Sequence, residues 1–361
     1  MKTISNITKG IKNIRSVLYY KQINILPRLL RNYIFAFFRI NENVPAPLEL
    51  QIEVSSLCNL RCEMCHIASR APSDQTKQIT TDQFRTIIGH SSPLMRVAFI
   101  GLGEVFTNKD LFQFFIHLNR QNISLFFYTN GMLLLDKNID ALIRNDVKEF
   151  GVSFESAIPE NFEKIRKGAK FSTIVNNIKK VRERYEEANK QIEISFGSVL
   201  LEKSIQEPEN LFSIIDIAND LSVSLVNFAN VANIKESGLD KYYSDATENA
   251  KLDKLFARLQ EYADIKNTRI RLPKTSLSQG ECRLPWVAAF VSVEGEVLPC
   301  CALMELGDHD EMVSLYSLGN LIHQPLSEIW NSKKAIDFRR RLSSSEPYEC
   351  CRKCSYYTGV L

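Results

Sequence analysis

The chain has 361 residues, of which 45 are Lys or Arg and 42 are Asp or Glu, so the formal net charge is +3. This length is sufficient to bury one large core and to add a smaller second module. The nearly balanced charge, with no recognisable nucleic-acid motif, argues against a nucleic-acid-binding protein. No signal peptide is recognised at the N-terminus, and we therefore expect a cytoplasmic protein.

The first predicted segment, residues 1–46, is basic and amphipathic. Its first forty residues hold eight Lys and Arg and no Asp or Glu, which leaves the rest of the chain net acidic by five. Arg28, Arg31 and Arg39 interrupt it well short of the roughly 20 apolar residues that cross a membrane. Such a segment either packs its apolar face on its own domain, which we expect, or lies on an anionic membrane or acidic partner. Peripheral membrane contact through residues 1–45 is the alternative.

A strand is predicted at residues 48–54, because apolar residues alternate with others there. Three cysteines follow it closely, Cys58, Cys62 and Cys65, with the spacing C-x3-C-x2-C. A four-iron cluster takes four ligands, so three thiolates leave one iron open for a substrate or cofactor. The carboxyl end of a strand is also where α/β barrels place their active sites. The motif therefore predicts a reactive iron–sulfur site.

This motif after a first strand resembles that of the radical S-adenosylmethionine (radical SAM) superfamily. In that family the open iron binds S-adenosylmethionine, whose reductive cleavage yields a 5′-deoxyadenosyl radical that takes hydrogen from a substrate. The resemblance implies a SAM-binding 4Fe-4S cluster on Cys58, Cys62 and Cys65, and an electron donor such as flavodoxin or ferredoxin. A zinc knuckle with His66 as fourth ligand is an alternative, although ligation by adjacent residues is strained. A disulfide pair with one spare cysteine is another.

The second predicted strand, residues 96–101, runs into the sequence Gly-Leu-Gly-Glu at 101–104. Glycines at a strand end let the backbone approach a ligand closely, and a carboxylate there can hold an ammonium group. The sequence resembles the Gly-Gly-Glu-Pro motif of the radical SAM family, with Leu and Val in place of the first Gly and the Pro. The resemblance implies that Gly103 and Glu104 bind the methionyl amino group.

Strands and helices then alternate along the chain, which predicts parallel βαβ units. We expect further strands at residues 124–129, 147–154, 192–200 and 223–228, with helices between them such as 172–187. Six units match the partial (β/α)6 TIM-like barrel of the resembled family, which we assign to residues 47–232.

In the resembled family, polar residues at the ends of later strands contact the ribose and carboxylate of the cofactor. The matching candidates are Asn130, Ser153, Glu155 and Ser198. For Glu155, capping of the following turn is an equal alternative. No catalytic residue is assigned from the sequence.

The remaining six cysteines fall in the last eighty residues: Cys282, Cys300, Cys301, Cys350, Cys351 and Cys354. Without a signal peptide, a metal module explains them better than a disulfide framework. Their pattern resembles the SPASM/twitch extension of radical SAM enzymes, a small β-hairpin followed by a helix that carries auxiliary iron–sulfur clusters. We assign it to residues 276–361 and the preceding helical bridge to residues 233–275.

A full SPASM domain needs more cysteines than these six, so the pattern resembles the one-cluster twitch form. The implied ligands of an auxiliary 4Fe-4S cluster are Cys282, Cys300, Cys351 and Cys354. Neighbours in an extended segment point to opposite sides, so Cys300 and Cys301 do not both face one cluster easily. The spacing Gly295-x4-Cys300 resembles the family hairpin, and this resemblance favours Cys300. Cys350 is an alternative to Cys351. A zinc ribbon with four cysteine ligands is the alternative for the whole module.

The sequence thus predicts a radical SAM enzyme in which the auxiliary cluster takes up an electron. The cysteine spacing resembles that of twitch dehydrogenases that oxidise a hydroxyl, which favours a sugar, alcohol or glycolipid-type substrate. The N-terminal segment is too short for the peptide-recognition domain of many peptide-modifying members. A maturase of a ribosomally made peptide and a non-enzymatic iron–sulfur or zinc scaffold are the two alternatives.

Overall fold

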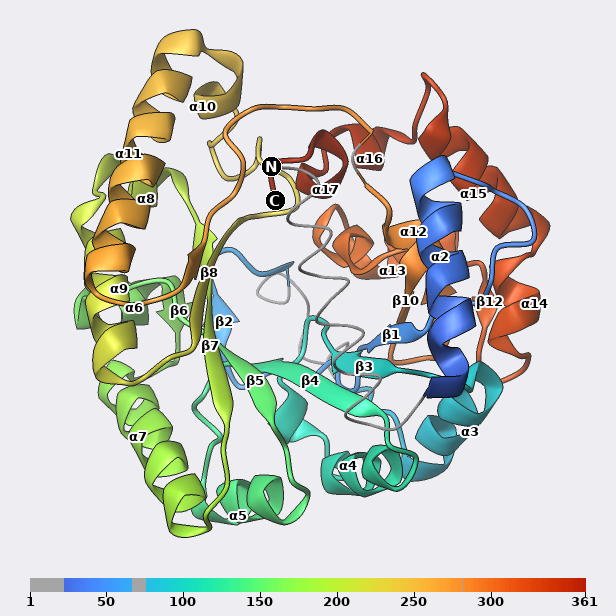
Figure 1. The fold of residues 1–361 in the computed structure, drawn as a ribbon, viewed down its shortest axis with the longest axis horizontal. Helices are drawn as coiled ribbons and strands as arrows, with labels where there is room; N and C mark the ends of the chain where they lie inside the picture. The colour runs from blue at the N-terminus through green and yellow to red at the C-terminus, as the bar shows by residue number, and fades with distance from the viewer. Residues whose placement is uncertain (1–22, 67–75, 281) are drawn as a thin grey trace.

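The computed structural model describes residues 23–66, 76–280 and 282–361 (Figure 1). The strands are β1 (Glu49–Ile52), β2 (Arg61–Cys62), β3 (Arg96–Phe99), β4 (Ser124–Thr129), β5 (Glu149–Ser153), β6 (Arg166–Lys167), β7 (Glu193–Leu200), β8 (Leu225–Asn230), β9 (Ile270–Arg271), β10 (Ala288–Val291), β11 (Glu296–Leu298) and β12 (Gly319–Asn320).

The helices are α2 (Leu26–Phe38), α3 (Thr81–Ser91), α4 (Leu111–Arg120), α5 (Asp136–Arg144), α6 (Pro159–Ile165), α7 (Phe171–Glu187), α8 (Glu202–Gln206), α9 (Glu209–Asp220), α10 (Lys241–Ser244), α11 (Ala246–Ile265), α12 (Leu284–Val287), α13 (His309–Tyr316), α14 (Leu326–Trp330), α15 (Lys333–Ser343), α16 (Glu349–Arg352) and α17 (Ser355–Thr358). Short 3-10 turns are η1 (Ile23–Ile25), η4 (Val105–Thr107) and η5 (Cys301–Glu305).

The main sheet has ten strands in the order β12-β11-β10-β1-β3-β4-β5-β7-β8-β9. The six predicted strands, β1, β3, β4, β5, β7 and β8, are consecutive in it and pair in parallel. Figure 1 shows them as an arc around the centre of the molecule, with α3, α4, α5, α7 and α9 outside it. The fold is therefore α/β, and the prediction of a partial TIM-like barrel is confirmed.

Apolar side chains buried between the strands and the outer helices stabilise the arc of strands. Helix α7 buries Ile174, Ile178, Val181 and Tyr185, which recur at helical spacing. Phenylalanine rings stack through the strand layer, with the Phe127 and Phe150 ring centroids 5.3 Å apart. Aromatic pairs of this kind add about 0.5–1.5 kcal/mol beyond their buried area. This packing fixes the strand ends that carry the polar residues described below.

The C-terminal hairpin continues the sheet of the barrel, a join that the sequence did not predict. Strand β10 pairs in parallel with β1, with Glu49 opposite Ala288, and β11 and β12 follow antiparallel. All four residues of β10 are buried. The cysteine-rich C-terminal segment is therefore anchored directly beside the strand that leads into the first three cysteines.

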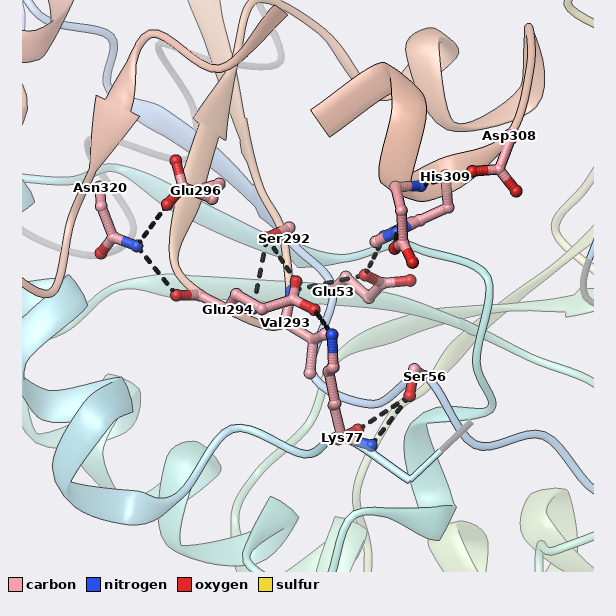
Figure 2. A network of polar contacts seen from close by, with 11 residues as sticks. Glu53, Ser56, Lys77, Ser292, Val293, Glu294, Glu296, Asp308, His309 and Asn320 are labelled. Carbon is pink, nitrogen blue, oxygen red and sulfur yellow. Dashed lines mark hydrogen bonds and ion pairs between the residues drawn. The ribbon is translucent and has the colours of Figure 1, made fainter. Parts of the chain in front are cut away.

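A buried polar network joins the two parts beside this pairing (Figure 2). Glu53 follows β1, and its carboxylate accepts hydrogen bonds from the Leu102 N–H (3.0 Å) and the Val293 N–H (3.4 Å). The same carboxylate lies 3.2 Å from Nε2 of His309, the first residue of α13. Buried polar groups require such partners, so the network fixes how α13 and the hairpin sit against the barrel.

Helix α2 packs one of its faces on the C-terminal elements. Its Asn32 side chain donates to the carbonyl oxygens of Pro45 (3.0 Å) and Trp286 (3.3 Å), and Leu29 and Ala36 are buried. The expected packing of this segment is therefore observed for the described part. Within the described ranges, no helix is both long and apolar enough to cross a membrane. Residues 1–22 of the predicted N-terminal segment lie outside the described residues.

Candidate active site

A cavity of about 1070 Å³ lies at the carboxyl ends of the parallel strands. Residues that follow or end β3, β4, β5, β7 and β8 line it, as do Cys58, Cys62 and Cys65. This is the position at which parallel α/β barrels place their active sites. The structure therefore brings the cysteine motif and the predicted strand-end residues to one cavity.

The cysteine loop is fixed by backbone contacts with the chain after β5. Cys62 lies in β2, which pairs with β6 opposite Arg166, and the Glu63 N–H donates to the Ile165 carbonyl at 2.8 Å. The Leu60 N–H lies 3.4 Å from Sγ of Cys58. Burial raises the pKa of both the Cys58 and Cys62 thiols. A bound metal has to displace these protons, because cysteine ligates as the thiolate.

Arg166 is a site residue that the sequence analysis missed. Its guanidinium donates from Nε and Nη2 to the two carboxylate oxygens of Glu155, and its Nη1 lies 3.7 Å from Sγ of Cys62. Burial by itself lowers the pKa of Arg166, but the Glu155 carboxylate outweighs this and raises it. A fixed positive charge therefore stands beside one of the three thiols. The only sequence signal was an Arg shortly after the fourth predicted strand.

This ion pair changes the interpretation of Glu155. The carboxylate lines the cavity and is 2 % exposed, but both of its oxygens are engaged by Arg166. The turn after it is instead held by Asn210, whose Oδ1 accepts from the Ala157 N–H at 3.1 Å. The capping alternative is thus wrong, and a contact of Glu155 with a cofactor stays a prediction.

Glu104 points its carboxylate at the end of β4. Oε1 accepts from the Thr129 hydroxyl at 2.6 Å, and Oε2 accepts from the Asn130 N–H at 2.7 Å. Burial raises the pKa of Glu104, against the lowering effect of these hydrogen bonds. The Asn130 side chain donates to Oδ1 of Asn59 at 2.9 Å, which ties the strand end to the cysteine loop. Glu104, Thr129 and Asn130 all line the cavity.

Gly103 is required by close packing within the chain. A Cβ atom there would lie 1.9 Å from the Ser55 carbonyl oxygen and 2.9 Å from that of Leu57. The backbone that approaches Gly103 in the structure is the start of the cysteine loop, which is a reason for glycine that the sequence did not predict. Gly103 still lines the cavity, so its predicted cofactor contact stays a prediction.

Two residues with unpartnered buried polar atoms line the cavity from neighbouring strands. Ser153, at the end of β5, and Ser198, in β7, both line it. Ser198 is 1 % exposed, and among the described residues its hydroxyl finds no hydrogen-bond partner. The same holds for Oδ1 of Asn230, which ends β8 and is 4 % exposed. Buried polar atoms normally have partners, so these two indicate a polar ligand in the cavity.

His66 does not join the three thiols. Its Nε2 lies 3.1 Å from the Glu305 carbonyl oxygen of η5. Nowhere in the described parts of the chain do three Cys, His, Asp or Glu side chains gather around one metal ion. The structure therefore gives the zinc-knuckle alternative no support. Cys58, Cys62 and Cys65 line one large cavity without converging on a single metal position. This fits the donor set of a multi-iron cluster, in which each cysteine binds a different iron.

The four predicted auxiliary ligands share a second, smaller cavity. Cys282, Cys300, Cys351 and Cys354 line it together with apolar and aromatic side chains such as Phe338. Burial raises the pKa of Cys300, and also that of Cys354, the latter to about 12. Four thiols in a small apolar cavity fit the donor set of a fully ligated four-iron cluster.

The two surplus cysteines are not among the residues that line this cavity, although the Cys350 and Cys351 side chains hydrogen-bond each other. Cys301 lines the large cavity instead, together with Glu305 and Tyr356. Sγ of Cys350 lies 3.3 Å from the Tyr316 hydroxyl. The sequence did not predict Cys301, Glu305 and Tyr356 as cavity residues, because no motif marks them. The C-terminal segment comes to the cavity through tertiary contacts such as the pairing of β10 with β1.

Two family models match the chain. The radical SAM superfamily matches residues 52–212, and the SPASM iron–sulfur cluster-binding domain matches residues 282–355. The first match includes Cys58, Cys62 and Cys65, and the second includes all six remaining cysteines. The radical SAM domain implies SAM and a 4Fe-4S cluster, and the SPASM domain implies auxiliary iron–sulfur clusters.

Curated relatives and solved structures agree with these matches. The tungsten-containing aldehyde ferredoxin oxidoreductase cofactor-modifying protein of Pyrococcus furiosus is 24% identical over 318 residues, covering 85% of this chain and 86% of the relative. The subtilosin biosynthesis protein AlbA of Bacillus subtilis is 22% identical over 298 residues, covering 80% of this chain and 60% of AlbA.

Among solved structures, Streptococcus suis SuiB bound to its precursor peptide SuiA superposes with a TM-score of 0.66 at 16% identity, covering 88% of this chain and 72% of SuiB. The structure of anSMEcpe with bound AdoMet superposes with a TM-score of 0.60 at 18% identity, covering 87% and 88%. These likenesses establish a shared fold. With both family models matched in order along the sequence, the chain belongs to the radical SAM superfamily and carries a C-terminal SPASM domain.

Proposed function

We propose that this protein is an enzyme that abstracts a hydrogen atom from a substrate held in the large cavity. The observation that carries the proposal is the division of the cysteines, because three line the large cavity and four others line a second, smaller one. Cys58, Cys62 and Cys65 would hold the SAM-binding cluster, and Cys282, Cys300, Cys351 and Cys354 the auxiliary cluster. Together with SAM, the first cluster supplies a 5′-deoxyadenosyl radical when bound and reduced.

The protein's own groups then bind and orient. The Glu104 carboxylate, held by Thr129 and Asn130, is placed to accept an ammonium group at the cavity wall. Arg166 supplies a buried positive charge beside Cys62. Gly103, Ser153, Glu155 and Ser198 complete the wall as proposed cofactor contacts, and the unpartnered Ser198 hydroxyl offers such a contact a hydrogen bond.

The auxiliary site would act in electron transfer. Its four cysteines leave no open iron, so a cluster there would exchange electrons without binding SAM. Reduction of the SAM-binding cluster would need an external low-potential donor such as flavodoxin or ferredoxin. The twitch assignment, with one auxiliary cluster, rests on these four thiols sharing one cavity while Cys301 and Cys350 lie outside it.

Two substrate classes remain in the proposal. Pockets for small ligands hold roughly 300–1000 Å³, and the 1070 Å³ cavity would accommodate SAM with a sugar, alcohol or glycolipid headgroup. The similarity to AlbA, a bacteriocin biosynthesis protein, and the shared fold with SuiB, which was solved with a precursor peptide, support a ribosomally made peptide equally well. The unpartnered cavity atoms require a polar group in either case.

The proposal is tested with anaerobically reconstituted protein, dithionite and SAM. An enzyme releases 5′-deoxyadenosine, whereas a non-enzymatic scaffold releases none. To separate the substrate classes, a short peptide encoded beside the gene is co-expressed with the protein and its mass compared with that of the peptide expressed alone. A mass change supports a peptide maturase; an unchanged peptide, with substrate-dependent 5′-deoxyadenosine release from a small-molecule extract, supports the small-molecule class.

Helix α2 supports a peripheral contact with an anionic membrane as an additional property. The face opposite its packed side exposes Leu30, Ile34, Phe37 and Phe38, with Phe37 and Phe38 74% and 69% exposed. The first forty residues carry eight positive charges and no negative one. An amphipathic helix of this composition suits the interface of an anionic lipid surface.

A further inference from the structure

Cys300 and Cys301 face different cavities although they are neighbours in sequence. Cys300 is extended, with φ −165° and ψ 161°, and lines the smaller cavity of the four thiols. Cys301 begins η5 and lines the large cavity instead. Cys301 is not among the residues that line the four-thiol cavity. Cys301 is thus a thiol beside the substrate space that the proposed clusters do not use.

The surroundings of Cys301 are built from three separate parts of the chain. The Tyr356 hydroxyl of α17 hydrogen-bonds the Cys301 sulfur. At the other end of η5, the Glu305 side chain accepts a hydrogen bond from the Ala232 N–H, just beyond β8. The Glu305 carbonyl lies 3.1 Å from Nε2 of His66, the residue after Cys65. The η5 turn is therefore held between the end of β8 and the loop of the three thiols.

A second observation points to a polar ligand in the same cavity. Asn230 ends β8, its Nδ2 donates to the Tyr243 hydroxyl and the Val360 carbonyl, and its buried Oδ1 has no partner among the described residues. Asn230 lines the same cavity as Cys301. An acceptor left unpaired at 4 % exposure costs free energy, which a donor from a bound molecule or a water removes. The thiol therefore shares its cavity with a group built to hold a polar substrate.

From this arrangement, and resting on the proposed function, we propose that Cys301 donates a hydrogen atom to a carbon-centred radical in the cavity. Its S–H bond breaks and a C–H bond forms. The sulfur is left one electron short, and it regains a thiol by taking one electron from a low-potential one-electron donor and one proton from water.

This role changes the overall reaction. A substrate that loses a hydrogen atom and then gives an electron to the auxiliary cluster is oxidised. A substrate that receives a new hydrogen atom from Cys301 is instead modified without net oxidation, and the new hydrogen comes from solvent because thiols exchange with water. Hydrogen donation by Cys301 would thus determine whether the substrate is oxidised or is modified without net oxidation.

The test uses the fully reconstituted protein in D2O with SAM and dithionite, without added substrate. In the absence of a substrate, the only carbon radical produced is that of the 5′-deoxyadenosyl group, and the exchanged S–D of Cys301 would quench it. We expect 5′-deoxyadenosine that carries one deuterium in the wild type and that lacks this label in Cys301→Ala and Cys301→Ser. The serine O–H bond is too strong to serve as donor. Cys350→Ser is the matched control and keeps the label.

The outcomes separate the two proposals. Unlabelled 5′-deoxyadenosine from the wild type, or full labelling in Cys301→Ala, overturns the donor role and leaves the proposed function intact. No 5′-deoxyadenosine at all overturns the proposed function and the donor role with it. Labelled product from the wild type and Cys350→Ser, lost in both Cys301 variants, supports the donor role.

Two readouts independent of activity check the position of the thiol. Cys301→Ser is expected to keep the iron content of the wild type, and N-ethylmaleimide is expected to alkylate Cys301 in the folded holoprotein while Cys300 stays protected. Loss of iron in Cys301→Ser, or alkylation of Cys300 with Cys301 unmodified, makes Cys301 a cluster ligand and overturns the inference.

Discussion

His309 and Glu53 meet across the boundary between the C-terminal module and the barrel, with Nε2 and Oε2 3.2 Å apart and the two side chains 2% and 1% exposed. The other ring nitrogen of His309 lies 2.9 Å from Oδ1 of Asp310. Beside this contact, a Cβ atom on Gly101 would lie 2.6 Å from the Glu53 side chain, so only glycine fits there. The position of α13 over the barrel therefore depends on one buried carboxylate.

Replacing the Glu53 carboxylate tests whether it holds the C-terminal module against the barrel. In Glu53→Gln, one acceptor oxygen is replaced by an amide donor, so either the Leu102 or the Val293 N–H faces another donor. We expect a loss of about 1–3 kcal/mol of folding free energy, which is typical for a buried polar group left without a partner. Thermal unfolding under anaerobic conditions measures it.

The control for this change is Glu294→Gln in the neighbouring hairpin. Glu294 forms an ion pair with Lys77 in which the side chains are 32% and 52% exposed. Exposed ion pairs contribute about 0–1 kcal/mol, so this variant is expected to melt close to the wild type. Equal effects of the two substitutions would contradict a joining role for Glu53.

Arg166→Gln is expected to destabilise the cysteine loop. It leaves the buried Glu155 carboxylate without its cation, and removing one partner of a buried pair costs about 3–5 kcal/mol. The double variant Arg166→Gln with Glu155→Gln has no unpaired charge and should recover part of this loss. Thermal unfolding of both variants measures the recovery, and no recovery would mean that the Arg166 contact with Cys62 dominates.

Iron content tests the assignment of the cysteines. Two four-iron clusters give about eight irons per chain. Replacing Cys58, Cys62 and Cys65 together with Ala should leave about four irons and abolish release of 5′-deoxyadenosine. Cys354→Ala should also leave about four irons, while cleavage of SAM without substrate largely persists. Retained cleavage in the triple variant would refute the assignment of the open cluster.

The same measurement distinguishes the forms of the C-terminal module. Cys350→Ser is expected to keep the wild-type iron content, because Cys350 does not line the four-thiol cavity and a serine hydroxyl can keep the hydrogen bonds to Tyr316 and Cys351. About twelve irons in the wild type would require a third cluster and exclude the twitch form. About four irons with one zinc would make the module structural.

The stability of α4 is expected to depend on pH through His117. Burial, with Arg85 and Arg120 nearby, lowers the pKa of this imidazole below 6.5. The unfolded chain therefore binds the proton first, so the folded state loses stability as the pH falls below about 6.5. His117→Gln lacks this contribution, and its melting temperature should fall less than that of the wild type between neutral and mildly acidic pH. Parallel pH profiles would contradict the lowered pKa.

Binding to vesicles tests the exposed face of α2. The wild type is expected to sediment with anionic phosphatidylserine vesicles at low salt and less at high salt, because screening weakens the attraction of its cations. The double variant Phe37→Ser with Phe38→Ser should lose most of this binding. Ile265→Ser, which changes an 80% exposed residue of α11, is the control. Equal binding by all three proteins would leave packing as the role of α2.

The sequence alone predicted the barrel because its information is local. Alternating apolar residues, turns and helical spacing determined all six parallel strands, for example residues 124–129, which form β4 with the same bounds. The C-x3-C-x2-C motif is equally local, since its three thiols lie within eight residues of one another. Spacing within one short loop fixes which side chains can share a site.

Only the tertiary structure decided which distant segments meet. The pairing of β10 with β1 brings Cys301, Glu305 and Tyr356 to a cavity whose other wall comes from strands earlier in the chain. The engagement of Glu155 by Arg166 likewise depends on the short β2–β6 pairing. Such contacts depend on strand order and on the path of loops, for which no periodic pattern in the sequence carries a signal.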